Sequence, residues 1–341
     1  MTGLTTEWRP ETGILGPAAE TPEWFAQRSF DPSREPPVVL GASEASVIAG
    51  LSQYKTPLEL YYEKRGLRPG KEANEAMIWG QYLQPAILGR YQELMGCRVS
   101  EFPYMIHLKD RPYIVATPDG IGWEDNSEDQ PWAIEIKNCS GFRYDKKHGR
   151  ERNCFGEGQD DVPFDYVMQA QQQMLVTGLE SCDLPVLFDG RKLRLYCVLS
   201  NKELMDTLVK TLEEFYQRVV NGDPPEPDFT QESTLEMIKD IFPVTSREVQ
   251  LTAEMAESVE KYQRSQGKIK HYESQKKEAQ AELLYAMQDA AVAHIVGSPY
   301  KLQRTAVPES MWAQEDIKKA QEKLGSVKRR GYTRFSIREE K

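Results

Sequence analysis

RPYIVATPDGIGWEDNSEDQPWAIEIK, residues 111–137, is the stretch that decides the fold of this chain. An apolar run at its start ends in the sequence PDG at 118–120, where Pro fixes the backbone, Asp can bond to its own main chain and Gly accepts a positive φ. Residues 132–137 alternate in polarity, which predicts a strand with one face in the core. Side chains two apart on a strand share a face, so Glu135 and Lys137 should point the same way.

Two carboxylates and an ammonium group should therefore meet at one margin of a sheet. Asp119 lies where the preceding strand ends, so it would lie beside Glu135 if the two strands were neighbours. Proteins hold Mg²⁺ with one or two carboxylates plus phosphate oxygens. Such a site activates water for attack on a phosphodiester. Lys137 would position that water or neutralise charge on the phosphate, and the main-chain carbonyl of Ile136 is a further candidate ligand.

Taken singly, each of these motifs has an ordinary structural explanation. PDG is a common turn, and an exposed Glu and Lys on a strand are usually solvated. The prediction of a metal site depends on the two motifs occurring together.

Periodicity and turn signals outline the other elements. Helices are predicted at 22–28, 43–48, 56–65, 74–95, 166–177, 201–220 and 246–290, and strands at 97–108, 111–117, 132–137, 184–188, 192–199 and 300–304. This order indicates an α+β fold with a central mixed β-sheet flanked by helices. Three regions follow: an irregular lead-in over 1–40, a compact domain over 41–228, and a C-terminal extension over 229–341 with a long helix and a basic end.

Composition narrows the class of protein. The chain has 341 residues, a net charge of −10 and five scattered cysteines, none in a CxxC pair. A disulfide framework or structural zinc site is not expected. No apolar run reaches the ~20 residues of a membrane span, and the N-terminus lacks a signal-peptide pattern, so a cytoplasmic location is expected. The acidic charge argues against a protein that coats nucleic acid without specificity, but a focused basic groove remains compatible with it.

Several further segments make the chain resemble a known family. The PDG and EIK motifs look like those of the PD-(D/E)xK nuclease superfamily. LGASEA at 40–45, YKTPLEL at 54–60, WGQYL at 79–83 and YVMQAQ at 166–171 are similar, in the same order, to motifs of YqaJ-like viral recombinases related to phage lambda exonuclease. Each motif is weak alone, whereas five in the family's order are specific. The compact domain is then expected to be a nuclease domain of that superfamily.

The resemblance implies roles for particular residues. Asp119 and Glu135 would be metal ligands and Lys137 the catalytic lysine. Gln169 or Gln171 would lie near the water or the phosphate. Where the family has a third acidic ligand this chain has Gln84, so either Glu44 compensates or a second metal binds weakly.

The resemblance also implies contacts to DNA. Ser43 would bind a phosphate through its hydroxyl and a helix N-terminus. Arg28 would hold the phosphate of a DNA end, with Arg34 as the alternative. Just past Lys137, a basic loop with interleaved aromatic residues is a candidate strand-binding segment or a merely solvated loop, and its basic residues are Arg143, Lys146, Lys147, His148, Arg150 and Arg152.

The implied function is a Mg²⁺-dependent DNA exonuclease of phage-type recombination, in which Mn²⁺ can replace Mg²⁺. It would digest one strand of linear duplex DNA from its end, 5′ to 3′, and leave single strand for an annealing protein. The family implies a homo-oligomer, a ring-shaped trimer, and no membrane partner. The alternatives are an endonuclease of the same fold, a non-catalytic DNA-binding or assembly module, and a related nuclease with an iron–sulfur cluster, for which the cysteine spacing is unsuitable.

Overall fold

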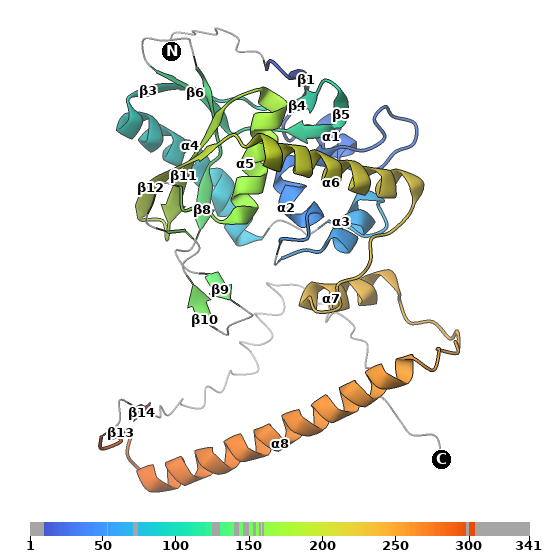
Figure 1. The fold of residues 1–341 in the computed structure, drawn as a ribbon. Coiled ribbons are helices and arrows are strands. Elements are labelled where there is room, and N and C mark those ends of the chain that lie inside the picture. Colours follow the sequence, from blue (N-terminus) through green and yellow to red (C-terminus); the bar gives the residue numbers. More distant parts are fainter. Residues whose placement is uncertain are drawn as a thin grey trace, which may run out of the picture. The chain divides into compact units, whose positions relative to one another are not determined.

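The computed structural model describes residues 10–303 apart from 53, 71–73, 125–129, 140–142, 146–149, 153–154, 157, 159 and 298–299. The chain divides into two compact units, Met1–Pro243 and Val244–Lys341 (Figure 1). The nuclease-domain bounds of 41–228 stay a prediction. Within the described residues no helix is long and apolar enough to cross a membrane.

The largest sheet of the first unit is mixed, which confirms the predicted α+β class. Its strand order is β12-β11-β7-β6-β3, and β8 pairs with β11 beyond the end of β7. β11 runs parallel to β7 and β8, while the other pairs are antiparallel. In chain order the strands are β3 (Cys97–Ser100), β6 (Gly120–Glu124), β7 (Trp132–Ile134), β8 (Lys137–Cys139), β11 (Ser181–Phe188) and β12 (Lys192–Leu199).

A second sheet has the order β1-β4-β5-β2. Its strands are β1 (Gly13–Ala18), β2 (Leu40–Gly41), β4 (Tyr104–Leu108) and β5 (Arg111–Ala116). The prediction that 1–40 is irregular is wrong at β1, which pairs antiparallel with β4. The single strand predicted at 97–108 is also wrong: β3 and β4 belong to different sheets, and Pro103 between them has no N–H for a ladder.

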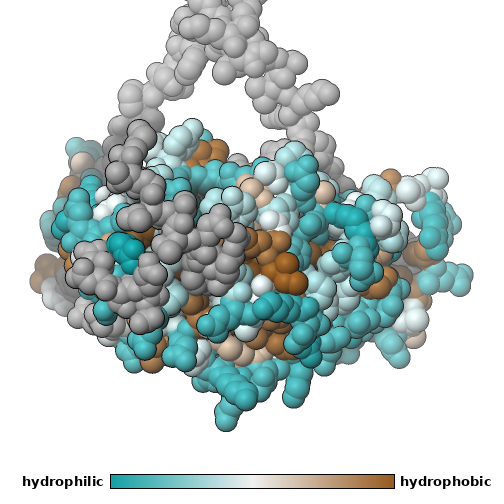
Figure 2. All heavy atoms as spheres, turned by 90° about the horizontal axis from the view of Figure 1, so that it is seen from above, coloured by the Kyte–Doolittle hydropathy of each residue, from teal (hydrophilic) through white to brown (hydrophobic). Residues whose placement is uncertain are grey.

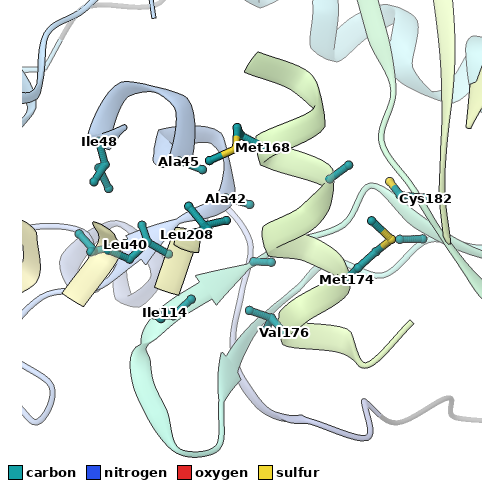
Figure 3. Close-up of a cluster of buried hydrophobic side chains, with 14 of the residues drawn as sticks. Leu40, Ala42, Ala45, Ile48, Ile114, Met168, Met174, Val176, Cys182 and Leu208 are labelled. Atoms are coloured by element: carbon teal, nitrogen blue, oxygen red, sulfur yellow. The ribbon is translucent and has the colours of Figure 1, made fainter. Parts of the chain in front are cut away.

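Helix α5 (Phe164–Thr177) joins the two sheets, because it packs against β4 and β5 of one and β7, β11 and β12 of the other. Figure 3 shows Met174 pointing toward Cys182 on one side of the helix and Val176 on the side of Ile114. Both Met174 and Val176 are buried in the main core cluster. A helix with apolar contacts around most of its circumference is a core helix, so polar side chains on α5 must find partners inside the protein.

The remaining helices of the first unit are α1 (Pro22–Gln27), η1 (Ala42–Glu44), α2 (Ala45–Ile48), α3 (Pro57–Lys64), α4 (Glu75–Met95), α6 (Lys202–Asn221) and α7 (Glu232–Ile241). Their ends follow the capping residues. Thr56 and Glu59 form a reciprocal capping box at α3, Asn74 caps α4, and Gly96 ends α4 at a φ of 60°. The helices predicted at 56–65 and 74–95 are thus confirmed to within a residue or two.

The strand that carries Glu135 is interrupted. β7 and β8 keep one register against β11, with Ile134 opposite Asp183 and Lys137 opposite Val186. The main chain at 135 and 136 between them is not part of the ladder, although Glu135 N still donates to Asp183 O over 2.9 Å. Pro185 lies level with this gap, and a proline has no N–H to donate. The predicted strand at 132–137 therefore becomes two short strands.

The second unit contains α8 (Met255–Met287) and a hairpin of β13 (Val292–His294) and β14 (Lys301–Gln303). Met287 is the one buried side chain of α8. In the first unit, β9 (Arg143–Asp145) and β10 (Arg150–Arg152) form a separate two-stranded ribbon. On the face drawn in Figure 2, most of the coloured surface is hydrophilic, and exposed apolar side chains gather near its centre.

Candidate active site

The two predicted metal-binding carboxylates face each other across the β6–β7 pair. Gly120 lies opposite Ile134 in the antiparallel register, and Asp119 N donates to Ile134 O over 3.0 Å. This register places Asp119 opposite Glu135. The strand responsible is β6, which the sequence analysis missed, whereas β5 before it belongs to the other sheet. Asp119 thus directly precedes β6, the strand that pairs with β7.

Main-chain and side-chain donors fix both oxygens of Asp119. Oδ2 accepts a hydrogen bond from the main-chain N–H of Ile136 over 2.7 Å, and Oδ1 accepts one from Gln84 Nε2 over 3.1 Å. Gln84 comes from α4. Gln84 therefore does contact the carboxylate cluster, but through a neutral amide.

Glu135 is almost fully buried, with 6 % of its surface exposed, and three side chains bind it. Its Oε1 accepts hydrogen bonds from Lys137 Nζ and Gln169 Nε2, both over 2.6 Å. Lys137 Nζ also donates to Gln169 Oε1 over 3.0 Å, which closes a triangle. Glu135 Oε2 accepts from Gln173 Nε2. The expected shared direction of Glu135 and Lys137 is confirmed.

Burial and mutual repulsion make the site electrostatically unfavourable when it is empty of cations. Burial, and then the charge of Glu135, raise the pKa of Asp119 to about 8, although the Ile136 N–H opposes this shift. Burial lowers the pKa of Lys137, but the Glu135 carboxylate more than compensates, so the net pKa is raised. The Glu135 carboxylate thus favours the ammonium form of Lys137, which can bind a negatively charged group.

A pocket of about 190 Å³ opens beside these groups. Asp119, Glu135, Gln169 and Gln173 line one part of it. Another part is lined by Trp24, Arg28, Gly41 and Ser43, and Arg28 stacks on the Trp24 ring at 4.6 Å. A cation and a hydroxyl thus share one cavity with two carboxylates, an arrangement suited to a substrate that carries phosphate next to a bound metal ion.

Comparison with known proteins agrees with this geometry. Residues 23–180 match the family model of the YqaJ-like viral recombinase domain. This segment resembles a YqaJ-like viral recombinase domain. It contains every residue of the carboxylate cluster and of the pocket. The uncharacterized protein YqaJ of Bacillus subtilis strain 168 is 26% identical over 257 residues, which are 74% of this chain and 76% of that protein.

Solved structures with a related chain trace include two exonucleases. An alkaline exonuclease from Laribacter hongkongensis is 22% identical, with a TM-score of 0.42 over 64% of this chain and 100% of that chain. A phage-related exonuclease from Haemophilus somnus 129PT is 13% identical, with a TM-score of 0.38 over 54% of this chain and 96% of that chain.

The glutamines of α5 in the YqaJ-like domain divide between two tasks. Gln169 and Gln173 are four residues apart, share one face of the helix and both bind Glu135. Gln171 does not join them. Its Nε2 donates to Leu199 O over 2.8 Å and its Oε1 accepts from Asn201 N over 2.8 Å, so it ties α5 to the β12–α6 connection.

Gln171 is therefore a structural residue, and its predicted place near the water or phosphate is wrong. Gln173 was missed, although its spacing of four from Gln169 is a signal that helical periodicity offers. Its side chain is 1 % exposed, and its Oε1 lies 3.6 Å from the thiol of Cys182. Burial raises the pKa of Cys182, so this group is a protonated donor, and it orients the Gln173 amide with its NH₂ toward Glu135.

Glu44 lies outside the carboxylate cluster of the YqaJ-like domain. Its Oε1 binds Arg28 Nη2 at 3.0 Å, and its Oε2 binds Lys64 Nζ and the main-chain N–H of Gly41, both at 2.8 Å. Burial alone would raise the pKa of Glu44, but the two cations lower it to about 2. With both oxygens bound by cations and an amide, Glu44 does not compensate for Gln84 as a metal ligand.

The predicted DNA-binding residues fall into three groups. Arg28 and the exposed Ser43 line the pocket, although η1 and α2 together are too short to supply a substantial helix dipole. Arg34 is bound to Asp31 at 3.3 Å and to Ser29 O, and it is not among the lining residues. Arg143 lies in β9, but the structure describes only its main chain. Lys146 and Lys147 fall outside the described residues.

Proposed function

We propose that the YqaJ-like domain hydrolyses phosphodiester bonds of duplex DNA from an end, with Mg²⁺ held by Asp119 and Glu135. The observation that carries this proposal is the placement of the two carboxylates opposite each other at the β6–β7 pair, with Lys137, the first residue of β8, bound to Glu135. Buried carboxylates in this arrangement repel each other unless a cation or a proton lies between them.

The donor set fits a single hard cation. Mg²⁺ prefers oxygen ligands, and nucleases often hold it with few protein groups plus water and phosphate. Asp119 and Glu135 supply carboxylate oxygens, and the Ile136 carbonyl is proposed as a third. Among the residues that the structure describes, no cluster of three His, Cys, Asp or Glu side chains could hold a metal. With Gln84 in place of a carboxylate, a second cation would bind weakly.

The bound metal ion would lower the pKa of a coordinated water and polarise the scissile phosphate. Lys137, kept protonated by Glu135, would place its ammonium group against the developing negative charge. Gln169 orients Lys137 and Glu135 through its two hydrogen bonds. Arg28 and Ser43 would bind a phosphate of the same strand and thereby set which bond reaches the metal.

The finer features of the reaction are proposed from the family resemblance. Digestion would run 5′ to 3′ and leave single-stranded DNA for an annealing protein. A closed homo-oligomer around the duplex would keep the enzyme on one DNA molecule. Mn²⁺ would replace Mg²⁺, since both accept oxygen ligands in octahedral geometry.

Digestion of linear duplex DNA that is labelled at either the 5′ or the 3′ end tests this function. We expect Mg²⁺-dependent early release of the 5′ label as mononucleotide and no cleavage of a covalently closed circle. Cleavage of intact circles would indicate an endonuclease. No cleavage of any duplex, together with no binding of Mg²⁺ or Mn²⁺ by calorimetry, would indicate a non-catalytic DNA-binding module.

A further inference from the structure

A buried chain of charges lies directly behind Arg28. Lys64 of α3 is 2 % exposed, and its Nζ binds Glu44 Oε2 at 2.8 Å and Val39 O at 2.8 Å. Glu44 Oε1 in turn binds Arg28 Nη2 at 3.0 Å. Of these three charged groups only Arg28 lines the pocket. The other two have no direct access to a ligand there.

Three neighbours restrict the position of the Arg28 guanidinium. Its guanidinium lies over the Trp24 ring and beside Glu44, and it passes so close to Gly41 that a Cβ at this position would lie 2.9 Å from Nη1. A planar guanidinium fixed in this way has few rotamers left to lose when it binds a phosphate. Glu44 thus defines where the cation of the pocket sits.

Lys64 changes the net charge of the group formed by Arg28, Glu44 and Lys64. One carboxylate between two cations leaves a net charge of +1, and that charge resides on the pocket side. Without Lys64, Glu44 and Arg28 would form a neutral pair, and an incoming phosphate would meet the carboxylate as well as the guanidinium. A buried ion pair is seldom needed for stability, since apolar residues can replace it at little cost. Its position next to the pocket favours a functional role.

We infer that Glu44 and Lys64 are positioning residues for DNA binding: Glu44 fixes the guanidinium of Arg28, and Lys64 offsets the Glu44 charge so that Arg28 remains available to a phosphate. This inference rests on the proposed function, in which Arg28 contacts the DNA end. It predicts a dependence on charge balance that a purely structural ion pair would not show.

The test measures binding by fluorescence anisotropy in EDTA, with the D119N background so that DNA stays intact. The probe is a short duplex whose end carries either a 5′-phosphate or a 5′-hydroxyl. Lys64→Met should reduce the preference for the phosphorylated end by about tenfold, as expected for weakening one charge-assisted contact. The double variant E44Q/K64M, which removes both buried charges and keeps the net +1, should recover most of that preference, and Arg28→Ala should abolish it.

Lys55→Met is the matched control, because Lys55 forms an ion pair with Glu63 of α3 at 2.5 Å and does not line the pocket. Its end preference should equal that of the background. Equal preferences in K64M and the background, or no recovery in E44Q/K64M, would overturn the inference. If K64M does not fold, the E44Q/K64M variant is the deciding measurement. If circular dichroism shows that this variant is folded and it has lost the preference for the 5′-phosphorylated end, the charge-balance role is contradicted.

Failure of the proposed function is separately visible, since digestion of linear duplex by the wild-type chain is its own assay. A chain without nuclease activity that still shows the K64M loss and the E44Q/K64M recovery supports the inference. A background that has no end preference, and in which Arg28→Ala changes nothing, overturns it.

Discussion

The main-chain N–H of Ile136 donates a hydrogen bond of 2.7 Å to Asp119 Oδ2. This bond joins the two sequence motifs at the residue that separates Glu135 from Lys137. Because the donor is a backbone group, the position of the Asp119 carboxylate depends on the course of the chain through 135 and 136 and not on the side chain at 136. The main chain at 135–137 therefore positions all three charged side chains of the site, Asp119, Glu135 and Lys137.

Asp119→Asn and Glu135→Gln should each lower the rate of Mg²⁺-dependent digestion of linear duplex by at least about 100-fold, because each removes a charged ligand from the proposed metal site. Circular dichroism should show the fold retained. Asp206→Asn, an exposed change on α6, is the matched control and should digest at the wild-type rate. Wild-type rates in either site variant would exclude the metal site at these residues.

The same Asp119→Asn change should stabilise the metal-free protein, and the gain should grow with pH. The folded pKa of Asp119 is about 8, above its ordinary value of 3.8, so folding takes up a proton between these pH values and wild-type stability falls as pH rises through that window. Thermal unfolding in EDTA at pH 5, 7 and 9 should show a widening gap, on the order of a few kcal/mol at pH 9. A gap independent of pH would contradict the raised pKa.

Gln173 and Gln171 provide a matched pair on one helix. Gln173→Ala should raise the Mg²⁺ concentration for half-maximal activity about tenfold, because it removes the partner of Glu135 Oε2. Gln171→Ala should instead lower the free energy of unfolding by about 1 kcal/mol, since Leu199 O and Asn201 N lose their side-chain partner. A Mg²⁺ titration and a urea titration on both variants decide, and the opposite assignment of effects would refute the division of labour.

Gln84→Glu should strengthen metal binding. The new carboxylate would lie beside Asp119 Oδ1, where Gln84 Nε2 now donates, and ligand charge raises affinity for a hard cation. Half-maximal activation is expected at a Mg²⁺ concentration lower by on the order of tenfold. Without metal, the added repulsion should lower the unfolding temperature at pH 9. Unchanged Mg²⁺ dependence would place residue 84 outside the metal site.

Sequence patterns predicted the site where the chemistry depends on local spacing. Glu135 and Lys137 are two apart on an extended chain, so their shared direction needs no knowledge of the rest of the fold. Asp119 was placed correctly beside Glu135, but by way of the wrong strand. β6 is five residues long and contains two glycines, which weaken its strand signal, and its pairing with β7 is a tertiary fact.

Side chains whose partners come from distant segments could not be assigned in this way. Gln169, Gln171 and Gln173 have the same chemistry on the same helix, and they differ only in what α5 packs against on each side. Glu44 was considered as a ligand that could compensate for Gln84. Its true partners, Arg28 and Lys64, lie 16 and 20 residues away in the sequence, and no local pattern connects them.

Pro185 of β11 has no amide hydrogen, and this affects the backbone that carries Glu135. With an amide proton at 185, the parallel ladder could continue without interruption from Ile134 to Lys137, and regular pairing would draw the peptide groups at 135 and 136 into the plane of the sheet. Pro185 cannot donate to the main chain here, although Glu135 N still donates to Asp183 O over 2.9 Å. The course of the main chain at Glu135 is thus set partly by a proline on another strand.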